Sequence, residues 1–399
     1  MKHLKRRLDG IEAHLAGHSV TLAAEYKGKI DHYSLKQSYR RLCFKNPILM
    51  AQLRHEEGIY LFEVFPHGSP HIVSRSGDRN TLLKEADGEW SPYNELARLL
   101  HIEGDNHGYI ALRADHSIVD AKALSKLLSE LLEQYTAISR GDAVSEDEPW
   151  GTLPKSPSQL LASRWGTGNA RLTYPPIPSV RVGEPELMEV IEKRISLSEE
   201  ETARLITSAR ESDTTVNSVV SGAILLALKK MSQSSIEEEI ICRSIIDLRK
   251  QVAPEVGATE TTNFVAWHTS RITISSHDNL MNVGREVRAN ILNGIRNRDI
   301  SLSAAAAVPE LSSRAPERRL AMTSITNAGV ITTPDMANSL EIASLFAARP
   351  KRLERAFFSR YAIHTMRRSL NVVGTFPSDI FNSKDATQVM DSISGLLRI

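Results

Sequence analysis

Residues 107–135 read HGYIALRADHSIVDAKALSKLLSELLEQY, and this stretch decides the fold. Its first seven residues are mostly apolar and include a tyrosine and an isoleucine, a composition typical of a β-strand. From Ala121 to Tyr135, leucines and the final tyrosine recur at helical spacing, which predicts an amphipathic helix with one buried face. A strand followed directly by such a helix indicates α/β or α+β layers.

The turn between this strand and this helix carries an H-x-x-x-D pattern, His116 to Asp120. A side chain on such a turn is held by two rigid elements and can point into a cleft. Histidine is mostly uncharged at neutral pH, so His116 can act as a general base. The same spacing occurs at His101 and Asp105. Spacing alone therefore leaves open that His116 is an ordinary turn residue and Asp120 only a helix cap.

Several common catalytic motifs are absent from the sequence. It contains no G-x-S-x-G, no Walker A loop, no H-E-x-x-H and no G-x-G-x-x-G. Serine hydrolases, P-loop enzymes and zincins are therefore disfavoured. With no activated serine or cysteine motif, direct attack by a substrate hydroxyl or amine is the simpler chemistry.

Length and composition bound the class of protein. The chain has 399 residues, 41% apolar and 24% charged, which indicates a globular protein of two domains. Its net charge of +1 disfavours a dedicated nucleic-acid binder. The two cysteines, Cys43 and Cys242, form no disulfide framework or cysteine-based metal site. We find no apolar run as long as a membrane span and no signal core after the basic start, and we expect a cytoplasmic protein.

A proline-rich segment divides the chain. Seven of the 17 prolines lie between Pro149 and Pro185. This composition interrupts helices and central strands, so we interpret the segment as a crossover between domains 1–175 and 176–399. A long surface loop within one domain is the alternative.

Both halves mix helical and strand patterns. The spacing of apolar residues predicts helices at Leu35–Leu42, Tyr93–Leu100, Val216–Met231, Asn279–Arg296 and Asp385–Leu397, and one that a Ser198–Glu201 capping box opens. Strands are predicted at Ala24–Asp31, Gly58–Phe65, Glu239–Leu248, Leu320–Ile331 and Arg355–Val373.

Four blocks, in this order, resemble a known superfamily. They are KGKIDHYSLKQSYRRLCFKNPILMAQL, RADHSIVDAKALSKLLSELLEQY, TTVNSVVSGAILLAL and SIIDLRKQVAPEVGATETTNF. The RADHSIVDA block resembles the HHxxxDG region, and the SIIDLRK block resembles the DLR segment, of the coenzyme-A-dependent acyltransferases, which include chloramphenicol acetyltransferase, peptide-synthetase condensation domains and plant BAHD enzymes. The chain most resembles the phthiocerol/phthiodiolone dimycocerosyl transferase type, which esterifies long acyl chains onto lipid diols. The resemblance implies two chloramphenicol-acetyltransferase-like α/β sandwich domains with mixed sheets and a shared tunnel.

The resemblance also implies roles for individual residues. His116 is expected to deprotonate an acceptor hydroxyl or amine, which attacks the thioester of an acyl-coenzyme A or a phosphopantetheine-bound acyl carrier protein, with no acyl-enzyme and no metal or permanent cofactor. Asp120 is expected to be structural and to pair with Arg249. Two positions depart from the motif: Asp115 replaces its first histidine and Ala121 its glycine, which leaves substrate fit open.

Four further residues match positions near the substrate in relatives. Asn263 resembles a channel asparagine that orients substrate, although a role in the core fits equally. The other three are Ser324, Thr326 and Asn327, at positions where relatives place residues close to the thioester. A hydroxyl at such a position could stabilise an oxyanion. The alternative is an ordinary strand.

Charge is unevenly distributed along the chain. Residues 285–368 carry 14 Lys and Arg against seven Asp and Glu. This stretch could receive coenzyme A phosphates or an acidic carrier protein, or it could be a solvated face.

The leading hypothesis is thus an acyltransferase that esterifies, or amidates, a small-molecule or lipid acceptor. A free-standing condensation enzyme that joins carrier-bound substrates is the second hypothesis. A non-catalytic module that binds carrier proteins is the third, and the presence of both His116 and Asp120 disfavours it. Nucleic-acid binding is remote, and acyl chain length, acceptor and oligomeric state stay open.

Overall fold

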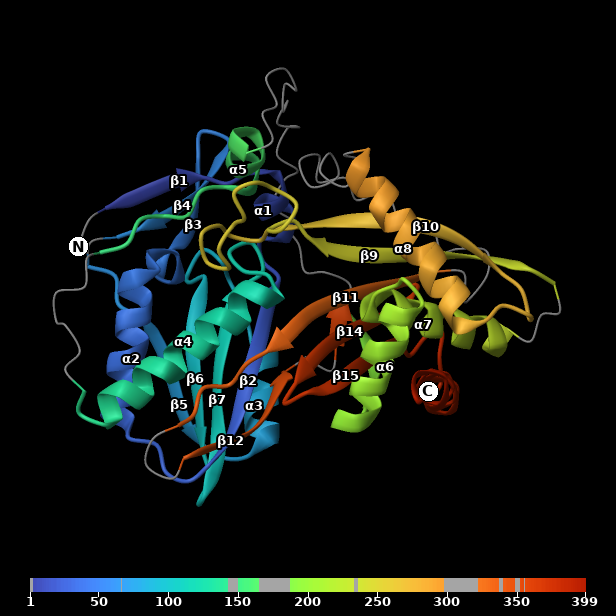
Figure 1. Cartoon of the computed structure of the whole chain (residues 1–399). Coiled ribbons are helices and arrows are strands. Elements are labelled where there is room, and N and C mark those ends of the chain that lie inside the picture. The colour runs from blue at the N-terminus through green and yellow to red at the C-terminus, as the bar shows by residue number, and fades with distance from the viewer. Residues whose placement is uncertain are drawn as a thin grey trace.

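The computed structural model describes residues 3–65, 67–142, 150–164, 187–232, 236–297, 322–336, 340–348, 352–354 and 356–399. These residues form two α/β lobes side by side, the first mostly blue to green and the second mostly yellow-green to red in Figure 1. The predicted domain boundary at 175/176 lies outside the described residues, as does much of the proline-rich segment.

A mixed five-stranded sheet forms the centre of the first lobe in the described part of the chain, in the order β12-β2-β7-β6-β5. Only β5 and β6 run parallel; the other neighbours are antiparallel. The bounds are β2 Ser19–Lys27, β5 His71–Ser76, β6 Ala97–Glu103, β7 His107–Asp115 and β12 Glu341–Ala347.

Helices cover both faces of this sheet. α2 (His32–Lys45) and α4 (Ala121–Ser139) pack on one face, and α3 (Arg79–Asp87) packs on the other. The leucines of α4 predicted to face inward are buried, so the helical spacing identified its core side. A small sheet extends this core, and its strands in order are β1 Leu4–Arg7, β4 Ile59–Val64 and β3 Gln52–Glu56. The remaining elements of the lobe are α1 Gly10–Leu15, η1 Pro47–Met50 and α5 Pro157–Arg164.

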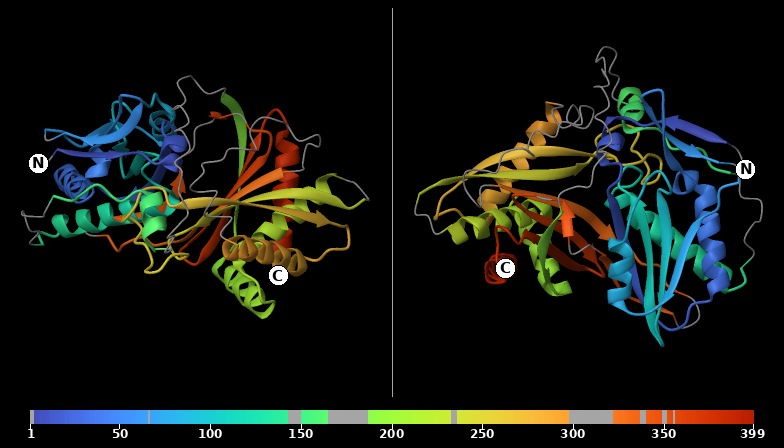
Figure 2. Two further views of the ribbon diagram at one scale, coloured as in Figure 1. Left: turned by 90° about the horizontal axis from the view of Figure 1, so that it is seen from above. Right: turned by 180° about the vertical axis from the view of Figure 1, so that it is seen from behind.

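The second lobe is built on seven strands among the described residues, in the order β10-β9-β11-β14-β15-β8-β13. Four helices share one core with one face of this sheet, and Figure 2 shows them gathered on that side. The strands are β8 Leu187–Ser196, β9 Glu238–Asp247, β10 Val265–Ile274, β11 Met322–Ile331, β13 Arg352–Glu354, β14 Ser359–Met366 and β15 Ser369–Pro377. The helices are α6 Glu199–Glu211, α7 Val216–Ser232, α8 Leu280–Arg296 and α10 Ser383–Leu397.

The other side of β9, β11 and β14 is covered by none of these four helices and is less buried, and we call it the helix-free face. On β9, for example, Cys242 and Ser244 are buried on the helix side, whereas Arg243 and Ile245 are partly exposed. The alternation follows from the period of two along a strand. Arg243 and other side chains on this face therefore keep part of their surface exposed.

Two of the predicted elements were wrong. The helix predicted at Tyr93–Leu100 is a turn followed by β6, because Ala97–Glu103 is a short strand buried on both faces and such strands carry no clear apolar period. The strand predicted at Arg355–Val373 is a hairpin of β14 and β15. Its turn is formed by Arg367 and Arg368, at φ 48° and 62°, without the Asn-Gly signal that usually marks such a turn.

One strand crosses between the lobes. β12 comes from the second half of the chain but pairs antiparallel with β2, placing Leu345 opposite Ala24. Its orange arrow reaches the sheet of the first lobe in Figure 1. The structural division therefore does not follow a single cut in the sequence.

No helix in the described ranges is both long enough and apolar enough to span a bilayer.

A close approach of α7 and α8 generates a stability prediction. A Cβ atom on Gly222 would lie 3.1 Å from the backbone nitrogen of Gly284 and 3.2 Å from the carbonyl oxygen of Leu280. We expect Gly222→Val to lower the free energy of unfolding by about 1–3 kcal/mol, because the added methyls force the helices apart. Urea denaturation measures this change.

Gly395 provides the control, since a Cβ there meets no atom within 4 Å. Gly395→Ala should stabilise the protein by up to about 1 kcal/mol through helix propensity. Equal stability of Gly222→Val and the wild type would contradict the close packing of α7 and α8.

Candidate active site

The turn after β7 carries His116 and ends where Asp120 caps α4. One carboxylate oxygen of Asp120, Oδ1, accepts hydrogen bonds from the backbone nitrogens of Lys122 at 3.1 Å and Ala123 at 2.9 Å. These donors have no partner inside the helix, so the cap fixes where α4 begins. The length of the turn that carries His116 is thereby fixed as well.

The other oxygen of Asp120 binds the second lobe. Oδ2 lies 2.7 Å from Nη1 of Arg249 and accepts a hydrogen bond from the backbone nitrogen of Phe264 at 2.9 Å. Both side chains of the pair are almost fully buried. The structure thus brings Asp120 and Arg249 together across the junction between the lobes.

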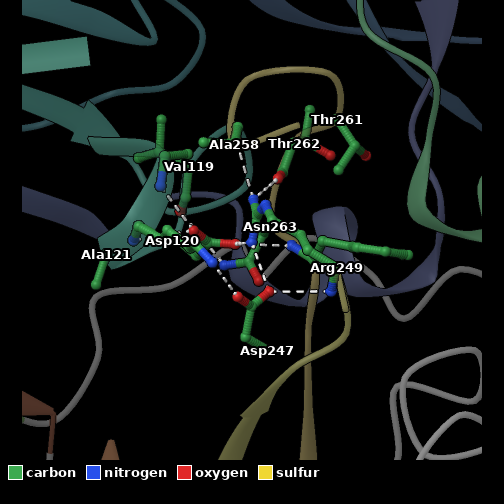
Figure 3. A network of polar contacts seen from close by, with 12 residues as sticks. Val119, Asp120, Ala121, Asp247, Arg249, Ala258, Thr261, Thr262 and Asn263 are labelled. Carbon is green, nitrogen blue, oxygen red and sulfur yellow. Dashed lines mark hydrogen bonds and ion pairs between the residues drawn. The ribbon is translucent and has the colours of Figure 1, made fainter. Parts of the chain in front are cut away.

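Both terminal nitrogens of Arg249 make further contacts at the same junction (Figure 3). Nη1 also lies 3.1 Å from Asp247, and Nη2 donates to the carbonyl oxygens of Ala258 and Thr262. Burial lowers the pKa of Arg249, but the charges of Asp120 and Asp247 outweigh it and hold the pKa above the ordinary value. The guanidinium therefore stays charged and orders the loop 248–263.

His116 is held in one tautomer. Its Nδ1 lies 2.7 Å from the carbonyl oxygen of Val119, which only accepts, so Nδ1 carries the proton. Its Nε2 has no hydrogen-bond partner among the described residues, and the side chain is partly exposed. The lone pair of Nε2 is therefore available to a ligand.

Asn263 fixes this turn from the second lobe. It is fully buried, and its Nδ2 donates to the carbonyl oxygens of His116 at 3.1 Å and Val119 at 3.3 Å. The same atom lies 3.2 Å from Nδ1 of His116. Two carbonyl acceptors show that the amide nitrogen faces the turn, so the geometry gives Asn263 a role in orienting His116.

The pKa of His116 lies below the ordinary histidine value. Burial is the largest cause, and the nearby His18 adds to it. The Val119 carbonyl and the charges of Asp120 and Asp115 oppose the shift without cancelling it. His116 is consequently neutral over a wider range of pH than a free histidine.

Asp115, which stands at the position of the motif's first histidine, anchors the end of β7. It is buried and accepts from the backbone nitrogens of Gly17 and Ser117, the hydroxyl of Ser117 and Nε1 of Trp90. Burial raises its pKa although these donors lower it. Its carboxylate is therefore engaged by the surrounding backbone, and the backbone nitrogen of His116 in turn donates to the carbonyl of His18.

A second contact between the lobes joins Thr262 to Glu12, and no pattern in the sequence predicted it. The hydroxyl of Thr262 donates to Glu12 of α1, and Arg6 forms an ion pair with Glu12 at 2.6 Å. Asp9 accepts from the backbone nitrogen of Ser158 at 2.8 Å, and burial raises the pKa of Asp9 to about 6. The buried positions of these charges follow no sequence period, although the Asp9–Glu12 capping spacing marks the start of α1.

The three candidates on β11 do not lie together. Ser324 and Thr326 are partly exposed on the helix-free face. Asn327 lies on the opposite face, where it donates to Oδ1 of Asn217 at 3.2 Å and accepts from the backbone nitrogen of Gly329. No contact in the described part of the chain joins any of the three to His116.

The site can therefore take a proton from a hydroxyl or amine at Nε2 of His116. In the described ranges, no group of three or more His, Cys, Asp or Glu side chains is arranged to hold a metal ion. Both cysteines are buried and free.

Solved structures with the same fold define the class. Polyketide synthase associated protein 5 from Mycobacterium tuberculosis superposes with a TM-score of 0.75 at 21% identity, covering 98% of this chain and 96% of that one. The trichothecene 15-O-acetyltransferase of Fusarium sporotrichioides gives 0.73 at 12% identity, over 99% and 95%. The first condensation domain of the CDA synthetase gives 0.68 at 12%, over 99% and 95%. The chain has the two-lobed fold of these acyltransferases and condensation domains, which confirms the predicted fold class.

Sequence comparison finds similarity to one family over part of the chain. Residues 187–372 match the family described as phthiocerol/phthiodiolone dimycocerosyl transferase C-terminus. The transferase of that name from Mycobacterium ulcerans is 28% identical over 62% of this chain and 62% of its own length. Its counterpart from Mycobacterium tuberculosis H37Rv is 23% identical over 73% and 74%. The match thus spans about three fifths of the first relative's length, and the predicted resemblance is confirmed.

The buried ion pair yields a prediction. Arg249→Ala leaves the carboxylate of Asp120 buried without its counter-charge, and we expect the free energy of unfolding to fall by ~3–5 kcal/mol. Asp120→Ala should cost a similar amount and also lose the cap of α4. Activity should be lost in both variants together with the fold, as circular dichroism and denaturant titration can measure.

Arg271 is the matched control. It pairs with Glu239 at 2.8 Å, but the two side chains are 62% and 52% exposed. Arg271→Ala should change the free energy of unfolding by only ~0–1 kcal/mol. If Arg249→Ala and Arg271→Ala lowered the free energy of unfolding equally, the buried pair would not be what stabilises the junction between the lobes.

Proposed function

We propose that this protein is an acyltransferase that moves an acyl group from a coenzyme A or carrier-protein thioester to a hydroxyl, or an amine, of a lipid or natural-product acceptor. The observation that carries the proposal is the state of His116. Its Nδ1 is committed to Val119, and its Nε2 keeps a lone pair with no partner among the described residues. A general base for a substrate hydroxyl needs this tautomer.

The reaction proceeds in one displacement without an acyl-enzyme. Nε2 of His116 takes the proton of the acceptor hydroxyl as the oxygen attacks the thioester carbonyl carbon. The carbon–sulfur bond then breaks, and the thiolate leaves with the proton that the imidazolium returns. Bringing acceptor and thioester together at one base supplies most of what this chemistry needs, because a thioester is already reactive.

Asp120 does not act as the third member of a triad. Its two oxygens are taken up by the start of α4, by Arg249 and by Phe264. The ring of His116 is oriented by Val119 and Asn263 instead. Asp120 therefore acts on the chemistry by holding the turn in place.

The class of substrates is supported by the relatives. Their name is that of a transferase acting on phthiocerol lipids, so a long-chain acyl donor and a lipid alcohol are the first substrates to try. Ser324 and Thr326 remain candidates for substrate contact on the helix-free face. A tunnel between the lobes through which both substrates reach His116 is part of the proposal.

Formation of an amide by a free-standing condensation enzyme is the second candidate. It is supported by the shared fold with solved condensation domains. Acceptors that differ only in carrying an alcohol or an amine separate the two reactions.

The proposal predicts that His116→Ala loses at least about a hundredfold in acyl transfer while keeping the stability of the wild type, since general-base catalysis contributes roughly 10²–10⁴. A panel of acyl-thioesters and lipid alcohols, scored by mass spectrometry, measures the product. The exposed His277 is the control, and His277→Ala should keep full activity. Full turnover by His116→Ala would refute the proposed mechanism.

The depressed pKa of His116 predicts the pH profile. Because the base is active when neutral and its pKa is lowered by burial, the rate should fall only at pH below the ordinary histidine value of 6.5. The kcat of the wild type, measured between pH 5 and 8 in one buffer series, tests this. An acidic limb centred above pH 6.5 would contradict the lowered pKa of His116.

A further inference from the structure

Two arginines and a serine lie in one row across three neighbouring strands of the second lobe. Ser324 of β11 is opposite Arg243 of β9 on one side and Arg360 of β14 on the other. All three are partly exposed and alternate with buried residues, so they share the helix-free face. Adjacent strands lie roughly 4.8 Å apart, which brings both guanidinium groups within reach of one small ligand.

Arg243 has an incomplete set of partners. Its guanidinium lies 4.9 Å above the ring of Trp267, which reaches the same face from β10. Its buried Nε has no hydrogen-bond partner, and no carboxylate pairs with it within the described ranges. Removing part of a guanidinium from water without a counter-charge is unfavourable, so an anion bound here would be stabilised.

The second arginine of the row adds a positive charge next to Arg243. Burial, and next to it the charge of Arg360, lower the pKa of Arg243 to about 10. Arg360 itself is placed by its contact with Phe358, 5.6 Å from guanidinium carbon to ring centre. Two planar cations on either side of a hydroxyl match the oxygens of a phosphate, which accept several hydrogen bonds at once.

The row is set apart from the catalytic turn by a fixed length of strand. Arg243 precedes Asp247 by four residues on β9, which is about 13 Å at the usual rise of a strand. Asp247 in turn contacts Arg249 next to Asp120. Trp267 continues the face to the first lobe, where its ring meets that of His14 at 5.8 Å.

We propose that Arg243, Ser324 and Arg360 form a binding site for a phosphate of the thioester donor. This inference rests on the proposed function. The phosphate on the pantetheine arm is common to coenzyme A and to a carrier protein's phosphopantetheine, and in both it lies at the far end of the arm from the reacting sulfur. A thioester at His116 and a phosphate at the arginine row are thus two ends of one donor.

Binding of three unacylated ligands tests the site. Coenzyme A, 4′-phosphopantetheine and pantetheine are titrated into the full chain by isothermal calorimetry, with the wild type, Arg243→Gln and Arg360→Gln. Both glutamine variants should weaken the two phosphate ligands about tenfold to a hundredfold, the range for hydrogen bonds to a charged group. Pantetheine, which has no phosphate, should bind weakly and equally to all three proteins.

Two further variants serve as controls for the loss of any arginine and for misfolding. Arg271→Gln removes an exposed arginine that is already paired with Glu239, so it should bind like the wild type. Arg243→Lys keeps the charge and should retain part of the affinity, which a misfolded variant cannot do. Equal binding of coenzyme A and 4′-phosphopantetheine supports the pantetheine phosphate as the ligand, whereas tight binding of coenzyme A alone overturns it.

The inference is also overturned if the wild type binds neither phosphate ligand, or if Arg243→Gln and Arg360→Gln bind both as the wild type does. No acyl group or acceptor is present, so the test is independent of turnover. If the protein transfers acyl groups but the arginine variants bind the phosphate ligands as the wild type does, the phosphate site is rejected and the proposed function stands. If the wild type binds the phosphate ligands through these arginines but transfers no acyl group, the proposed function is rejected and the phosphate site stands.

Discussion

A buried arginine joins the two lobes beside the turn that carries the candidate base. Arg249 contacts Asp120, Asp247 and the carbonyl groups of the loop 248–263, and Asp120 is at the same time the cap of α4. The turn that carries His116 lies between β7 and this cap, so its shape depends on a charge supplied from more than a hundred residues away. The position of the candidate base therefore depends on how the two lobes pack against each other.

The electrostatics of the site are dominated by burial. Burial lowers the pKa of the His116 imidazole more than the carbonyl of Val119 and the charges of Asp120 and Asp115 raise it. His116 stays neutral, and Val119 and Asn263 determine which nitrogen carries the proton. The ion pair thus holds the turn in place, while burial keeps the histidine on that turn neutral.

Local sequence patterns predicted the elements around the site well. The apolar period of α4, the capping box at Ser198 and the apolar stripe of α8 all mark helices that the structure contains. β6 and the β14–β15 hairpin were mispredicted, because burial on both faces and an Arg-Arg turn leave no local signal. The contacts of Asn263 and Asp115 depend on tertiary packing, so no spacing reveals them, and the pairing of Arg249 was implied only by family resemblance.

The path of β12 has a consequence for how this protein is made. The edge of the first lobe's sheet at β2 is completed by a strand whose residues are synthesised more than three hundred positions later. On the ribosome, the open edge of β2 must stay unpaired while the second lobe is still being translated, and unpaired edges are prone to wrong pairing. The first lobe therefore cannot finish folding as an independent cotranslational unit, and loop closure over this distance makes its last step dependent on the second lobe.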